Sequence, residues 1–394
     1  MTFFANRDVN RLVVHATLNE LAFCFSGVFS AVFLLRAGLT VPEIFLLFGA
    51  VLLLRLVLRP LVLTVAPAIG LRRSLILGTV LQGVQYPMLA LVHGVAPALV
   101  AYCAISALGQ VFYWTTYHAF FSALGDSELR GSQVAERQML GTVADVLGPA
   151  AGGVMLAAFG PWPAFLTAFV IELIAVVPLL YVAEPAIARA APAGVYAAAK
   201  NGFWLFVCGG WIFNCSATAW SIIMFRALAA RYDAYGGLLA AGALAGALSG
   251  MLFGRFIDRG HALRLTWVNG AILAGSLIVK AICGEAPLPV IAVALGTTIV
   301  GGLYIPSLMT AVYNEAKLAA CPLRFQFVVE GGWDVGGALA CLASAAVCAA
   351  NLPLQLVILL ALPAALWQVR LLIGSYATLG ARQAAAVDGL SPGL

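Results

Sequence analysis

Long apolar stretches, separated by short polar connections, run along almost the whole chain. Each has about 20 to 30 residues, enough to cross a hydrocarbon layer of about 30 Å as a helix. Charged residues, prolines and glycines place them near 11–37, 42–66, 72–93, 95–122, 133–159, 161–183, 201–230, 234–258, 263–284, 287–313, 325–350 and 352–378. The pattern predicts an all-α polytopic membrane protein with twelve transmembrane helices.

The connection between the sixth and seventh stretches is the longest polar-flanked one. It predicts an N-terminal six-helix bundle over 1–183, a linker over 184–200, and a C-terminal six-helix bundle with a short tail over 201–394.

The two halves repeat with an offset near 190 residues. Arg36 in FLLRA corresponds to Arg226 in IMFRA, and Asp145 in DVLG corresponds to Asp334 in DVGG. An offset of six spans gives both copies the same topology, so we expect a parallel duplication. Any substrate site is then expected between the two bundles near the middle of the membrane.

Composition and charge support a membrane location. Of the 394 residues, 63% are hydrophobic and only 9% are charged, whereas soluble domains carry about 25% charged residues. Soluble enzymes, nucleic-acid binders and secreted disulfide scaffolds are therefore poor interpretations. With both termini in the cytoplasm, 17 of the 21 lysines and arginines are assigned to that side, whereas Arg36, Arg226 and Arg231 lie outside and Lys280 lies within a span. The arginine excess in an alanine-rich chain indicates a bacterial inner membrane.

The sequence contains no signature of cofactor chemistry. It has no GxxxxGK[ST] nucleotide loop, no HExxH and no CxxC. We therefore expect no enzyme activity, no cofactor and no metal, and we expect the energy for any transport to come from a gradient. The expected partners are the lipid bilayer, a small-molecule substrate and protons, with the chain as a monomer.

Two acids lie at bilayer depth, where a charge costs at least about 2.5 to 3.5 kcal/mol on insertion scales. Glu20 lies near the midplane of the first stretch, and Asp145 lies near the middle of the fifth. Both are candidate proton-coupling residues, with a structural carboxyl as the alternative. For Asp145, the candidate basic partners are Arg255 and Arg259, although both lie about two turns too shallow.

The fifth stretch also carries closely spaced small residues. Small residues allow a neighbouring helix to approach, and a proline removes one helical hydrogen bond and permits a bend. We therefore expect a tight, bendable helix interface here, with ordinary close packing as the alternative. The residues concerned are Gly141, Gly148, Pro149, Gly152 and Gly153.

These residues resemble the GPxxGG motif of the major facilitator superfamily, often found in its antiporters. A second segment, GRFIDRG from Gly254 to Gly260 followed by Arg264, is similar to the superfamily's G-x-x-x-D-R-x-G-R-R loop. The resemblance implies a gating role for Asp258 and Arg259. It also implies that the second and eleventh spans adjoin across the two halves.

Two charged pairs fit that adjacency. Arg55 and Arg59 are spaced i, i+4, as are Glu330 and Asp334, so each pair occupies one helical face. Matching their depths opposes Arg59 to Glu330 and Arg55 to Asp334. We interpret the four residues as a gate that closes the cytoplasmic side, with a static buried ion-pair cluster as the alternative.

The resemblance further implies that the first, fourth, seventh and tenth spans line the substrate cavity. Aromatic rings around an acid suit an apolar or cationic organic molecule, although helix packing explains such rings equally well. The candidate substrate-binding residues are Asn19, Gln110, Tyr113, Trp114, Tyr117, Trp211, Asn214, Thr218 and Tyr304.

We interpret the chain as a secondary transporter that moves a small amphipathic organic molecule by alternating access, as a proton-coupled exporter of the antiporter type. A proton symporter or facilitator that imports a metabolite is the alternative. It is favoured by the absence of lysine and arginine between His93 and Arg130, where many proton antiporters of the superfamily carry an arginine. A non-transporting receptor or assembly factor on the same scaffold is the interpretation from another class.

Overall fold

The computed structural model describes residues 6–124, 130–185, 191–257, 262–298, 308–309, 311–316 and 319–387, and these are almost entirely helical. Eight of the described helices are long and apolar enough to cross a membrane, and three shorter helices are apolar as well. The N-terminal part contains α1 (Arg7–Ser26), η1 (Gly27–Phe29), α2 (Ser30–Arg36), α3 (Val41–Leu58), α4 (Pro60–Ile69), α5 (Leu71–Ala90), α6 (Pro97–Leu124), α7 (Arg130–Phe159) and α8 (Pro161–Leu179).

A short helix, α9 (Val195–Ala198), precedes the C-terminal part. That part contains α10 (Lys200–Ala227), α11 (Tyr232–Ile257), α12 (Ala262–Ile282), α13 (Pro287–Thr297), α15 (Pro322–Ala349), α16 (Leu354–Leu359) and α17 (Ala361–Val387). Most of these bounds lie within a few residues of the predicted ones. The last helix, α17, extends beyond the predicted end at residue 378.

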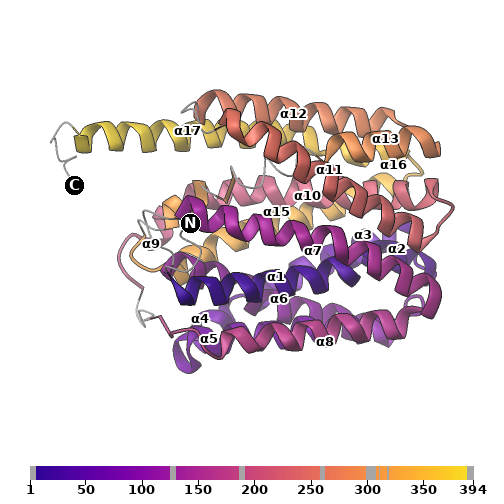
Figure 1. Cartoon of the computed structure of the whole chain (residues 1–394), viewed down its shortest axis with the longest axis horizontal. Helices are drawn as coiled ribbons and strands as arrows, with labels where there is room; N and C mark the ends of the chain where they lie inside the picture. The colour runs from indigo at the N-terminus through magenta and orange to yellow at the C-terminus, as the bar shows by residue number, and fades with distance from the viewer. Residues whose placement is uncertain are drawn as a thin grey trace.

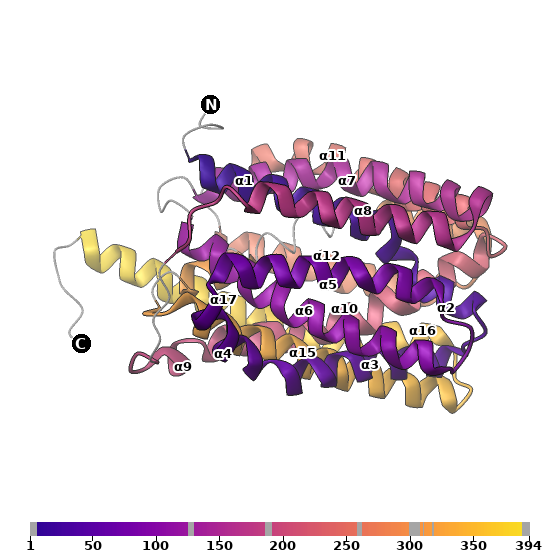
Figure 2. The ribbon, with the colours of Figure 1, turned by 90° about the horizontal axis from the view of Figure 1, so that it is seen from below.

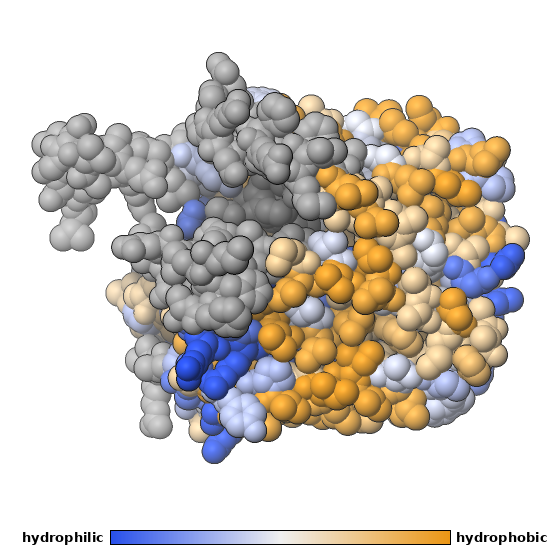
Figure 3. Space-filling view, viewed as in Figure 1, coloured by the Kyte–Doolittle hydropathy of each residue, from blue (hydrophilic) through white to orange (hydrophobic). Residues whose placement is uncertain are grey.

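The long helices run nearly parallel to the longest axis of the molecule (Figures 1 and 2). The first described helix begins at the same end at which α17 ends, on the left of Figure 1, and we call this the termini end. Figure 3 shows hydrophobic side chains over the middle of the described surface and hydrophilic ones towards both ends of the long axis. This distribution is the one expected for a bundle that crosses a bilayer.

Helices that are far apart in the sequence pack against each other. The N-terminal part meets the C-terminal part through α3 on α15 and through α7 on α11. Away from the termini end, Phe29 packs edge-on against Tyr235, with 5.6 Å between ring centroids, and also contacts Tyr232. These rings belong to one hydrophobic core that joins the two parts.

The small residues of α7 allow two close helix contacts. A Cβ built on Gly152 would lie 1.9 Å from the carbonyl oxygen of Phe25, and one built on Gly148 would lie 2.6 Å from Cys24 Cβ. On the other side, a Cβ on Gly153 would lie 3.2 Å from the Cα of Gly236 in α11. The close helix approach predicted from these glycines is therefore present, against α1 on one side and α11 on the other.

Candidate functional site

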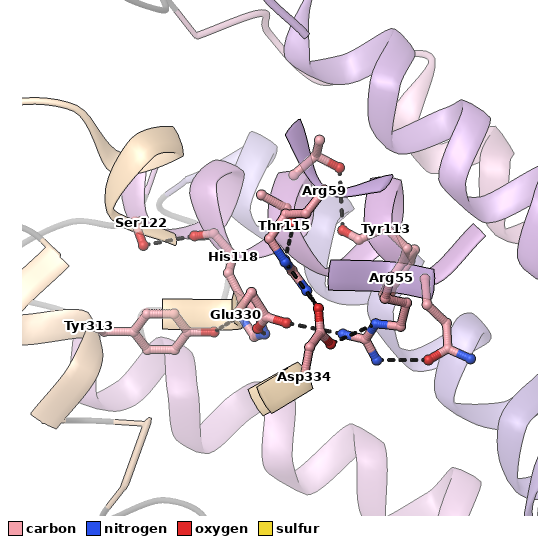
Figure 4. A network of polar contacts seen from close by, with 11 residues as sticks. Arg55, Arg59, Tyr113, Thr115, His118, Ser122, Tyr313, Glu330 and Asp334 are labelled. Carbon is pink, nitrogen blue, oxygen red and sulfur yellow. Dashed lines mark hydrogen bonds and ion pairs between the residues drawn. The ribbon is translucent and has the colours of Figure 1, made fainter. Parts of the chain in front are cut away.

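Four charged side chains meet where α3 contacts α15, and we call them the four-charge cluster: Arg55, Arg59, Glu330 and Asp334. They are only 0 to 4% exposed. Arg55 Nε lies 2.9 Å from Asp334 Oδ1 and its terminal nitrogen lies 3.5 Å from Glu330. Arg59 Nε donates to Asp334 Oδ2 at 3.0 Å, and its terminal nitrogen makes a second contact with the same oxygen (Figure 4).

The four residues predicted from spacing and depth do lie in contact with one another. The predicted contact between Arg55 and Asp334 is present. The predicted contact between Arg59 and Glu330 is wrong. Asp334 lies between the two guanidinium groups and forms an ion pair with each of them. Glu330 points towards α6, where its Oε1 lies 3.4 Å from His118 Nε2.

The α6 helix supplies a third polar face to the four-charge cluster. Gln110 accepts a hydrogen bond from Arg55 at 2.9 Å, and the Thr115 hydroxyl accepts one from Arg59 at 2.8 Å. Gln110 therefore contacts the charged residues, although we predicted a place in the substrate cavity. Sequence reasoning missed Thr115 and His118. Thr115 and His118 are spaced i, i+3, and that spacing was the signal that would have found them together.

A second polar group joins α1 to α7, and we call it the carboxyl–thiol cluster: Glu20, Cys24 and Asp145. The Cys24 thiol lies 3.2 Å from Asp145 Oδ1 and 3.8 Å from Glu20 Oε1. One oxygen from each carboxyl and the sulfur lie within 4.8 Å of one another. The two acids that were predicted separately from their depth therefore meet around one thiol, because Gly148 and Gly152 allow α1 and α7 to touch.

Arg137 is the basic residue that sequence reasoning missed. Its guanidinium lies 5.3 Å from the centre of the Tyr117 ring and within electrostatic range of Glu20 and Asp145. We expected Arg255 or Arg259 to serve Asp145. Arg259 lies outside the described residues, and the structure describes no side chain for Arg255. Arg137 stands eight residues before Asp145 on the same helix, so a long side chain on α7 itself provides the positive charge.

The aromatic residues of α6 lie together, as their helical spacing predicted. The rings of Tyr113 and Tyr117 stack with 5.7 Å between centroids and 5° between planes, and Trp114 packs edge-on against Tyr113. Both tyrosines are buried. His15 of α1 lies 5.7 Å from the Tyr113 ring, which connects this stack to the first helix.

Asn19 lies against α8. Its amide donates to both carboxylate oxygens of Glu172, at 2.8 and 3.0 Å, and both side chains are buried. The neighbouring residue on α1, Glu20, instead points to α7. One residue of a helix is rotated by about 100° from the next, so these adjacent residues serve different contacts.

The predicted residues of the seventh span do not gather at one place. The Trp211 indole donates to the carbonyl oxygen of Leu360 at 2.8 Å and lines an apolar cavity of about 580 Å³ between α10, α15, α16 and α17. Asn214 donates to the Gly210 carbonyl, and Thr218 is buried on α10. Tyr304, Asp258 and Arg259 lie outside the described residues.

The fold and the buried charges define an all-helical polytopic membrane protein. A family model described as Major Facilitator Superfamily matches residues 19–341, so the chain belongs to that superfamily. Among solved structures, the chain is similar to the human organic anion transporter MFSD10 (TETRAN), at 15% identity and a TM-score of 0.68, over 93% of this chain and 99% of that one.

The chain is also similar to the POT family transporter PepTSo, at 13% identity and a TM-score of 0.71, over 94% of this chain and 98% of that one. These likenesses concern the fold. No curated protein matches the sequence significantly. Membership of the superfamily identifies the chain as a membrane transporter.

Proposed function

We propose that this transporter is a proton-coupled exporter of small amphipathic organic molecules that works by alternating access. The observation that carries the proposal is the carboxyl–thiol cluster. Glu20 and Asp145 come from different helices, and their carboxyl oxygens lie within 4.8 Å in the interior of the bundle. Two carboxylates this close repel each other, and a shared proton or the positive charge of a substrate relieves that repulsion.

Competition between those two occupants would couple transport to protons. A proton that binds to the pair displaces a cationic substrate, and a substrate that binds displaces the proton. Arg137 lies in the same field and offsets one of the two negative charges. The stacked, buried rings of Tyr113 and Tyr117 lie near Arg137 and place aromatic surface beside the charged groups.

In this mechanism the four-charge cluster acts as the gate. It holds α3 against α15 on the side of the termini end, and its two positive and two negative charges balance. Arg59 stands ten residues before Ile69, which places the cluster about 15 Å from that end. We place this end in the cytoplasm because most lysines and arginines belong to it, and we propose two rocking six-helix bundles in a monomer of a bacterial inner membrane.

An importing symporter or a facilitator is the second candidate. The observation that favours it is the absence of lysine and arginine from the described α6 helix, where its polar face carries Gln110, Thr115 and His118 instead. The name of the human relative says that MFSD10 transports organic anions. The carboxyl pair of this chain favours neutral or cationic molecules.

Flux in proteoliposomes tests the proposal. The purified protein is presented with a panel of amphipathic cations, neutral compounds and anions, with and without an imposed pH gradient. We expect movement of cationic or neutral compounds against their gradient, in the direction opposite to protons. Accumulation in the same direction as protons supports the symporter, and gradient-independent equilibration supports the facilitator. The absence of flux for every compound contradicts all three and favours a receptor or assembly role.

A further inference from the structure

His118 bridges α6 to two elements of the C-terminal part. Its Nδ1 lies 2.7 Å from the hydroxyl oxygen of Tyr313, and its Nε2 lies 3.4 Å from Glu330 Oε1. All three side chains are at most 5% exposed. The imidazole is also stacked on Trp114, with 5.6 Å between ring centroids, so its position is fixed from the side as well. Figure 4 shows this bridge directly beside the ion pairs.

A neutral imidazole satisfies both contacts. The tautomer with its proton on Nε2 donates to the Glu330 carboxylate, and the Tyr313 hydroxyl donates to Nδ1. In that state Arg55 and Arg59 balance Glu330 and Asp334, so the buried set carries no net charge. The closed arrangement between α6, α3 and α15 is therefore complete with an unprotonated His118.

A proton on His118 removes this balance. It places a third positive charge among two negative ones inside the bundle, where an uncompensated charge is strongly unfavourable. The charged and titratable groups around the ring are Glu330 on α15, Tyr313 on the 311–316 segment and Tyr117 on α6 itself, and Arg137 on α7 lies within electrostatic range. Arg59 bonds Thr115, one turn before His118 on α6. The acid already contacts Arg55, so it cannot compensate fully for one more cation.

We propose that His118 is a second proton-binding site, separate from the carboxyl–thiol cluster, and that a proton bound there opens the contact between α6 and the Glu330–Tyr313 pair. The proposal rests on the proposed function, in that the four-charge cluster is the gate of a transporter. It deepens that function by giving the gate a proton of its own. The gate then responds to the pH on its own side even without a substrate.

Spin labels on the two sides of the gate test this proposal in the full-length protein in nanodiscs. Cysteines at the exposed positions Arg73 and Ala320 near the termini end report the distance between the two parts by pulsed electron paramagnetic resonance. In this background only the partly exposed native cysteines, Cys103, Cys283 and Cys348, are replaced, and the buried ones, Cys24 included, are kept. The pH is varied between about 8 and about 5, the range in which histidine ordinarily titrates. No substrate and no gradient are present.

We expect the wild type to shift to a longer distance as the pH falls. His118→Gln, which keeps a donor and an acceptor but takes no proton, should stay at the short distance throughout. His118→Arg, which is always charged, should show the long distance at every pH. The control His93→Gln, at an exposed histidine, should behave like the wild type. A wild type without a pH response, or a His118→Gln variant that keeps it, overturns the proposal.

Repeating the measurement with Glu20→Gln separates the two proposals. If this variant keeps the pH-dependent distance change but has lost proton-driven flux, both proposals stand. If the distance change depends on His118 while Glu20→Gln transports normally, the proposed coupling site fails and the gate proposal survives. If the distance change disappears with Glu20→Gln, His118 is not an independent site and the gate proposal fails.

Discussion

The contact between Arg59 and Asp334 should be the strongest link between α3 and α15. Both side chains are at most 1% exposed, and the guanidinium makes two contacts with one carboxylate oxygen. Asp334→Asn leaves Arg55 and Arg59 facing Glu330 alone, so one positive charge stays uncompensated. Removing one partner of a buried pair costs about 3 to 5 kcal/mol. We therefore expect this substitution alone to lower the thermal stability markedly.

The double variant measures the coupling energy between Arg59 and Asp334. Arg59→Gln combined with Asp334→Asn restores a balance of one positive and one negative charge, so we expect stability to recover although neither single variant is stable. For residues in direct contact the coupling energy is about 0.5 to 3 kcal/mol, and the complete burial here predicts a value near the upper end.

Thermal unfolding of the purified wild type, both single variants and the double variant provides the cycle. The exposed ion pair of Arg231 with Asp233 uses the same residue types and serves as the control, for which Arg231→Gln and Asp233→Asn should show no measurable coupling. Strictly additive losses for Arg59 and Asp334 would show that the two residues do not interact and would refute the assignment of the gate.

Two further predictions concern the N-terminal part. Gly152→Ala should destabilise the protein by about 1 to 3 kcal/mol, because its methyl group would meet the Phe25 carbonyl, whereas Gly141→Ala, which meets nothing within 4 Å, should be neutral in the same thermal assay. Equal stability of the two variants contradicts the close α1–α7 contact. Glu172→Leu should cost about 1 to 3 kcal/mol by leaving the buried Asn19 amide without its acceptor, and Glu172→Gln should retain most of the stability; equal losses argue against this bond.

The sequence predicted the helices well because the length of an apolar stretch decides whether it crosses a membrane. It also found the residues of the four-charge cluster, since spacing gives the face of a helix and distance from the helix end gives the depth. The contact of Glu330 with His118 was missed because matching residues by depth gives their position along the membrane normal but not the direction in which each side chain points. Asp334 lies between both arginines, and the rotation of Glu330 towards His118 depends on how α6 packs, which no spacing within α15 records.

The substrate residues were harder to predict for a related reason. The superfamily resemblance assigns whole spans to the cavity, but the face of the helix decides what each residue contacts. Asn19 faces Glu172 on α8 and Trp211 faces the break between α16 and α17, although both stand on spans assigned to the cavity. Arg137 was overlooked because its long side chain reaches the aromatic stack from two turns away on the helix of Asp145.

In the proposed mechanism protons drive transport through the carboxyl–thiol cluster, and flux under an imposed pH gradient with Glu20→Gln tests this most directly. The control is Glu285→Gln, which removes an exposed carboxylate between α12 and α13 by the same chemical change. For a compound that the wild type moves in proteoliposomes, we predict that Glu20→Gln loses gradient-driven accumulation but still exchanges substrate across the membrane, and that Glu285→Gln transports normally. Unaltered gradient-driven transport by Glu20→Gln would contradict the account.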